Sequence, residues 1–186
     1  MEIVRTVFQN AESRDGSGVG PKLVIVLDMG REMGMNTADI PGLAHKMEMA
    51  LPGIFPDEGS PYLHTCGGQS TGIEVHSFRD EIKQGTDIPH LLEHVLLHLL
   101  SRRTNHCSAY CGQRATDLDR GITTHYYLVV DCPSRIEGIV AADLAYNLVT
   151  SWIDNSALGI DPAAYLDGIR ATLEPMIGFM PNNAHL

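Results

Sequence analysis

Residues 88–103 read IPHLLEHVLLHLLSRR and form the most strongly patterned segment of the chain. Apolar side chains recur there at the three- and four-residue spacing of an amphipathic helix, namely Leu91, Leu92, Val95, Leu96, Leu99 and Leu100. Arg102 and Arg103 follow at the end where the helix dipole favours positive charge. The pattern predicts a long helix with a broad buried face.

The flanking segments predict an α+β protein. Runs rich in β-branched and aromatic residues predict strands at 3–8, 22–28 and 124–132, and a glycine-rich turn predicts a hairpin between the first two. Helical spacing predicts further helices at 41–50, 77–84, 136–152 and 162–176, the first capped by Asn36 or Thr37. Residues 53–72 and 104–121 are interpreted as loops. We expect one domain over residues 1–186, with helices packed on a small, largely antiparallel sheet.

The charge balance limits the classes of partner. Thirteen Lys and Arg against twenty-three Asp and Glu give a formal net charge of -10. Such a surface repels nucleic acid and anionic membranes and attracts a cationic partner. The apolar runs are too short to span a bilayer, and no export signal is recognisable, so a cytoplasmic location is expected.

The cysteines are interpreted as free thiols. The four of them, Cys66, Cys107, Cys111 and Cys132, contain no C-x-x-C pair, and a reducing cytosol disfavours disulfides. The cluster of His106, Cys107 and Cys111 raises the alternative of a structural zinc site, but it lacks a second ligand pair at the usual spacing.

The helix at 88–103 carries the spacing H-x-x-E-H in His90, Glu93 and His94. Residues four apart on a helix have Cβ atoms about 5–6 Å apart, so two imidazoles can reach one metal ion. Glu93 lies on the same side and could act as a general base on a water molecule that zinc has acidified. The alternative is a polar helix face that holds these three residues by chance. We expect a zinc site with His90 and His94 as ligands and Glu93 as the catalytic residue.

A zinc ion needs a further protein ligand beside two histidines and a water molecule. Asp131 is the expected third ligand because it ends a strand, where a carboxylate can face a neighbouring helix. His64 and Cys66 remain alternatives. His98 lies another turn along, with its Cα about 12 Å from that of His90 on a straight helix, so we interpret it as a pocket wall.

The central helix and the residues before it resemble a known family. Gly85-Thr86-x-x-x-His90-x-x-Glu93-His94-x-x-Leu97 resembles a signature of the amino-terminal domain of cyanophycin synthetases. Shorter pieces agree in order, including Ile40-Pro41-Gly42, Leu51-Pro52-Gly53, His64-x-Cys66 and the strand that ends at Asp131.

The resemblance implies that His90 and His94 bind zinc, that Glu93 is the general base and that Asp131 stands where the family has glutamate. In that family the domain holds a polymer of aspartate and arginine, and in some members a zinc-peptidase-like site cuts the polymer. Three departures concern the substrate: His98 replaces a glutamate, residues 112–116 match a family loop with one residue fewer, and the family's G-G-F segment has no clean counterpart near residues 67–78. The ATP-grasp and Mur-ligase-like modules of the synthetases are missing from these residues, so we expect a standalone domain.

These observations favour a zinc-dependent hydrolase of amide or peptide bonds, acting on a cationic peptide or an Arg-Asp polymer. His64, His98 and Arg114 are the expected substrate contacts. Two alternatives remain, a non-catalytic binding domain and a partner subunit of an ATP-dependent amino-acid ligase. A homo-oligomer is compatible with each of these readings.

Overall fold

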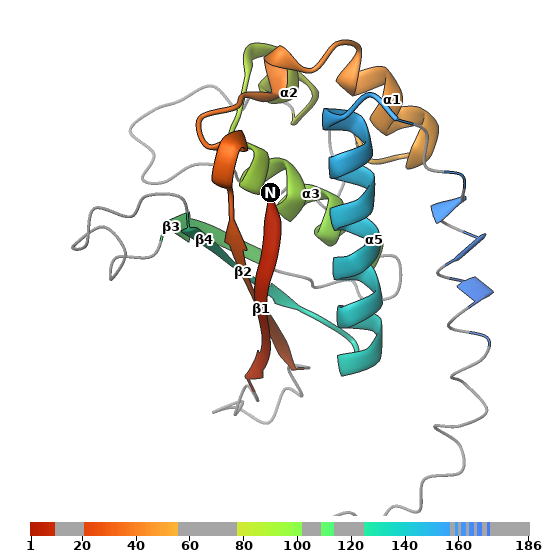
Figure 1. Cartoon of the computed structure of the whole chain (residues 1–186). Helices are drawn as coiled ribbons and strands as arrows, with labels where there is room; N and C mark the ends of the chain where they lie inside the picture. The colour runs from red at the N-terminus through yellow and green to blue at the C-terminus, as the bar shows by residue number, and fades with distance from the viewer. Residues whose placement is uncertain are drawn as a thin grey trace, which may run out of the picture.

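The computed structural model describes residues 1–9, 21–55, 78–101, 109–113 and 125–156, and isolated positions between 159 and 171. Within these ranges a four-stranded sheet is formed by β1 (Glu2–Gln9), β2 (Lys22–Asp28), β3 (Ala109–Gln113) and β4 (His125–Asp131), as Figure 1 shows. The strand order is β1-β2-β4-β3, and every neighbouring pair is antiparallel. The α+β prediction with an antiparallel sheet is confirmed.

One face of the sheet forms part of the core. Alternate residues of a strand point to the same face, and here the alternation is apolar. The register pairs Leu23 with Val130, Ile25 with Leu128 and Leu27 with Tyr126, and all six side chains are buried. A slip of one residue would turn this whole set to the opposite face, so burial fixes the pairing of β2 with β4.

Helices α3 (Ile88–Ser101) and α5 (Arg135–Ile153) cover that face. The other helices are α1 (Leu43–Ala50) and α2 (Phe78–Gln84), with short 3-10 helices η1 (Gly30–Glu32) and η2 (Thr37–Asp39) after β2. Helix α3 contacts β3 and β4, α5 contacts β2, and the two helices pack against each other (Figure 1). The six apolar side chains predicted for the buried face of α3 are all 1% exposed or less. Helix α3 therefore buries the face that its apolar spacing predicted.

Three details differ from the sequence-based expectations. Strand β3 lies inside the segment that was expected to be a loop. Asn36 caps η2, where its side chain accepts a hydrogen bond from the Ala38 N–H, and it does not cap α1. Helix α1 begins instead after Gly42, whose φ of 67° is a left-handed conformation that glycine adopts without strain.

The ends of the fold are described in part. The positions described between 162 and 171 are helical, in agreement with the predicted helix at 162–176, and the remainder of that helix lies outside the described residues. Residues 15–20 of the predicted glycine-rich turn and most of the loop at 53–72 also lie outside them. In the described part of the chain, no helix combines the length and the apolar character needed to cross a membrane.

Candidate metal centre

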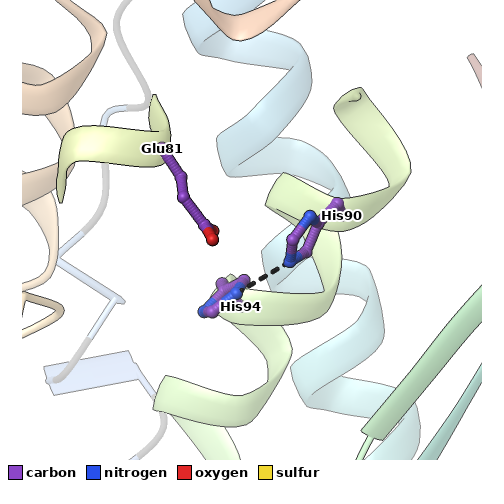
Figure 2. A group of neighbouring side chains, drawn as sticks. All are labelled: Glu81, His90 and His94. Carbon is purple, nitrogen blue, oxygen red and sulfur yellow. Dashed lines mark hydrogen bonds between the residues drawn. The ribbon is translucent and has the colours of Figure 1, made fainter. Parts of the chain in front are cut away.

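Helices α2 and α3 meet at a sharp corner, and three side chains converge there. Glu81 of α2 points toward His90 and His94 of α3 (Figure 2), and the ligand atoms of the three residues all lie within 4.8 Å of one another. The Nε2 atoms of His90 and His94 are 3.0 Å apart. No other such cluster of three or more His, Cys, Asp or Glu occurs among the described residues.

The corner follows from the local sequence. Helix α2 ends at Gln84, and Gly85 takes a φ of 113°, a conformation that reverses the chain and that glycine adopts readily. The last helical hydrogen bond of α2 runs from the Gly85 N–H to the Glu81 carbonyl at 2.8 Å. Pro89 lies in the first turn of α3, where a missing N–H is tolerated. The reversal turns Glu81 toward the first two turns of α3.

The ring of His90 is oriented by Thr86. The Thr86 hydroxyl oxygen lies 2.9 Å from His90 Nδ1. When Nδ1–H donates to this oxygen, Nε2 carries the lone pair, and Nε2 is the atom that faces His94. A hydrogen bond of this kind on the far nitrogen fixes both tautomer and ring orientation in histidine metal ligands.

The ring of His94 is held by a stacked aromatic side chain. Phe78 lies over it with ring centroids 3.6 Å apart and planes 10° from parallel. Phe55 packs at 5.6 Å from Phe78, and the Arg79 guanidinium lies 4.6 Å from the Phe55 centroid while it pairs with Glu48 at 2.8 Å. His94 is itself buried, with 8% of its surface exposed.

The geometry and chemistry of the three residues fit a zinc ion. Nitrogen ligands at about 2.0–2.1 Å from a tetrahedral zinc lie about 3.3 Å from each other. The observed 3.0 Å between the two Nε2 atoms is close to this value. Two histidines and a glutamate are also the protein ligands of one group of catalytic zinc sites. In a metal-free protein the same two imidazoles make a direct hydrogen bond.

Glu93 is buried beside this centre but is not one of the three converging residues. Only 4% of its surface is exposed, and burial raises the pKa of its carboxyl group to about 7. Desolvation is the cause, since removal from water disfavours the charged form.

Asp131, the predicted third ligand, lies elsewhere. It is the last residue of β4, and its carboxylate accepts a hydrogen bond from the Lys22 ammonium at 2.5 Å. The register sets Lys22 directly opposite Asp131, so this pairing of opposite charges across two strands holds the side chain at the end of the sheet. The structure therefore brings Glu81, and not Asp131, to the two histidines.

The remaining predicted residues divide into two groups. His98 lies one turn beyond His94, is partly buried and is not in the converging group. His64, Cys66, Arg114 and the pair His106 and Cys107 lie outside the described residues. Cys132 is a free thiol, and it donates a hydrogen bond to the Pro21 carbonyl.

The sequence analysis did not identify Glu81 as a candidate ligand. Periodicity indicates which face of a single helix is buried, but it does not indicate the angle at which two helices meet. The available signal was local: a predicted helix at 77–84 carries a carboxylate and ends at Gly85, five residues before His90. A connection that short makes the two helices neighbours in space.

Fold and site together define an α+β domain with a candidate carboxylate–histidine–histidine metal centre at a helix corner. The chain belongs to the family of cyanophycin synthase-like N-terminal domains, whose sequence model matches residues 24–154. The matched region starts in β2, includes the α2–α3 corner and ends just after α5. This confirms the resemblance seen in the sequence. A comparison with curated proteins gave no match.

Proposed function

We propose that this domain is a zinc-dependent hydrolase of amide or peptide bonds that acts in the cytoplasm, with Glu81, His90 and His94 as the residues that hold the ion. The observation that carries the proposal is the convergence of these three side chains within 4.8 Å. The ring contacts of Thr86 and Phe78 support it, because a ligand set whose rotamers are held in advance loses less entropy on binding.

A bound zinc ion would supply an acidified water molecule and would polarise the carbonyl of the bond to be cut. Glu93 supplies the proton transfer. It lies three residues after His90 and directly before His94 on α3, and its side chain is buried. Its carboxylate accepts the proton of the attacking water and passes it to the nitrogen of the leaving amine.

The proposed substrates are cationic, such as an Arg-rich peptide or an Arg-Asp polymer. Two facts support this class: the formal net charge of -10, and membership of a family named for cyanophycin synthase. We propose that His98, which follows the two histidines on α3, contacts the substrate together with His64 and Arg114.

A second candidate is a non-catalytic binding domain or a partner subunit of an ATP-dependent amino-acid ligase. The direct contact between His90 and His94 favours it, because a hydrogen bond between the rings satisfies both nitrogens without an ion.

The two candidates are separated by metal content and turnover. Purified protein is analysed for zinc and assayed on an Arg-Asp polymer and a panel of Arg-containing peptides. If the domain is the hydrolase, the wild type should bind about one zinc per chain. A His90→Ala/His94→Ala variant should stay folded but bind no zinc. Glu93→Gln should keep its zinc and lose about 10²–10⁴ in hydrolysis rate. Equal rates for wild type and Glu93→Gln would refute the proton transfer. A folded wild type that cleaves nothing on this panel, with or without bound zinc, would favour the second candidate.

A further inference from the structure

Thr37 connects the two helices of the candidate metal centre, although it lies about fifty positions earlier in the chain. It belongs to η2, and only 1% of its surface is exposed. Its hydroxyl donates to the Ile82 carbonyl at 3.0 Å and accepts from the Thr86 N–H at 2.8 Å. Its own N–H donates to the Thr86 carbonyl at 2.9 Å.

These bonds reach both elements that carry the converging side chains. The Ile82 carbonyl belongs to the last turn of α2, where carbonyls lack helical partners, and Ile82 directly follows Glu81. Thr86 has both backbone groups bound by Thr37, and its hydroxyl then meets His90 Nδ1 at 2.9 Å. One buried side chain thus sets the end of α2 and the residue that orients His90.

The turn around Thr37 also fits the corner closely. Asn36 and Asp39 form a capping box that rigidifies η2, and Asn36 makes a β-bridge with Asp87. A Cβ atom on Gly85 would lie 2.1 Å from the Asn36 side-chain oxygen, so a larger residue there would force the Asn36 side chain to move. The Gly85-Thr86 pair therefore matches the shape and the hydrogen-bonding groups of the turn at 36–39.

We infer that Thr37 is a positioning residue of the metal centre. It fixes the α2–α3 corner so that Glu81 and the Thr86-bound ring of His90 meet at one point. The inference rests on the metal-binding part of the proposed function and is independent of hydrolysis. Loss of the Thr37 hydroxyl should weaken metal binding, because Glu81 and His90 would still be present but would no longer be held in place.

The test measures zinc affinity by competition with a chromophoric chelator, and the visible spectrum of the Co²⁺-loaded protein, for wild type and variants. Thr37→Val keeps the shape and removes the hydroxyl. Thr37→Ser keeps the hydroxyl. Thr86→Val removes the direct contact with His90, and a double variant combines it with Thr37→Val. Ser151→Ala is the matched control, because it deletes a buried hydroxyl that donates within α5, to the Leu148 carbonyl.

Partners that orient metal ligands are typically worth 10–100-fold in affinity. We expect Thr37→Val to weaken zinc binding about tenfold, at the lower end of that range because it acts through Thr86 and α2. Its Co²⁺ spectrum should change, and Thr37→Ser should restore both readouts. The double variant should bind zinc more weakly than Thr86→Val alone, but by less than the two single losses combined, because Thr37 and Thr86 share the route to His90 and only Thr37 also acts on α2.

Two results would overturn the inference: a Thr37→Val protein that loses thermal stability as Ser151→Ala does but binds zinc like wild type, or fully additive losses in the double variant. If Thr37→Val does not fold, Asn36→Ala loosens the same turn, and unchanged zinc affinity in that variant is equally decisive. A wild type that binds no zinc overturns the metal centre and the role of Thr37 together. A wild type that binds zinc and cleaves nothing refutes only the hydrolase, since affinity is measured without substrate.

Discussion

His90 and His94 bring their Nε2 atoms to 3.0 Å from each other on successive turns of α3. One ring is held by the Thr86 hydroxyl and the other by the face of Phe78. The two imidazoles are thus oriented by contacts from the corner and from α2, outside the helix that carries them. Preorganised ligands of this kind make the strength of metal binding sensitive to residues that never touch the ion.

Glu81 should matter for metal binding and Asp131 should not. Glu81→Gln removes the carboxylate that points at the two histidines, so we expect zinc affinity to fall by at least about tenfold. Asp131→Asn breaks the ion pair with Lys22, which should cost about 1 kcal/mol of stability. Competition with a chromophoric chelator measures the first effect and urea unfolding the second. A larger loss of zinc affinity in Asp131→Asn would show that Asp131 is the ligand.

Phe78 should act on the metal centre through His94. Phe78→Leu stays apolar but loses the flat ring stacked at 3.6 Å on His94. Aromatic pairs contribute about 0.5–1.5 kcal/mol, so zinc affinity should fall roughly two- to tenfold. Phe55→Leu is the control, because it removes an aromatic ring that packs on Phe78 and leaves the Phe78 ring that stacks on His94 in place. Equal zinc affinities for Phe78→Leu and wild type would mean that stacking does not orient His94.

Gly85→Ala should disrupt the corner for two separable reasons. The φ of 113° strains any residue with a Cβ atom, which costs on the order of 1–3 kcal/mol, and the new methyl group would meet the Asn36 side chain at 2.1 Å. We expect a lower melting temperature and weaker zinc binding. Adding Asn36→Ala should recover the steric part and leave the backbone strain. If the double variant is no more stable than Gly85→Ala, the clash with Asn36 is not the cause.

Glu32 should stabilise the fold in a pH-dependent way. Burial tends to raise its pKa, but hydrogen bonds from the ammonium of Met1 and from Arg31 outweigh burial and lower the pKa of Glu32 from 4.5 to about 2. A carboxyl group with a lowered folded-state pKa stabilises the protein above its unfolded pKa, and this contribution is lost as the pH falls from about 4.5 to 2. The difference corresponds to about 3 kcal/mol.

Glu32→Gln should therefore lower stability at neutral pH and flatten its decline between pH 4.5 and 2, as followed by urea unfolding at several pH values. Glu48→Gln is the control, because its ion pair with Arg79 is exposed to solvent. A Glu32→Gln variant with the acid sensitivity of wild type would contradict the assignment.

The sequence was most informative where a single element carries its own pattern. The apolar spacing of α3 and the β-branched runs of β2 and β4 reflect burial of one face, which periodicity reports directly. Strand β3 has no such pattern in its sequence. Its Cys111-Gly112-Gln113 lacks β-branched residues, and pairing with β4 makes it a strand, which is a long-range effect.

The site shows the same division between local and long-range information. His90 and His94 are fixed relative to each other by the helical repeat, so their convergence could be predicted. The third member depends on how α2 turns back at Gly85, and the position of Asp131 depends on its pairing with Lys22. Neither relationship leaves a periodic signal in the sequence.

The three converging side chains all lie between residues 81 and 94, on two helices joined by residues 85–87. Contacts this close in sequence close only a short loop, so bringing them together costs little chain entropy and can occur early in folding. The sheet, in contrast, must join β2 to β4 across about a hundred residues. A metal ion could thus bind the helical corner before the sheet is complete, and the ion would then select the chains whose corner has already formed.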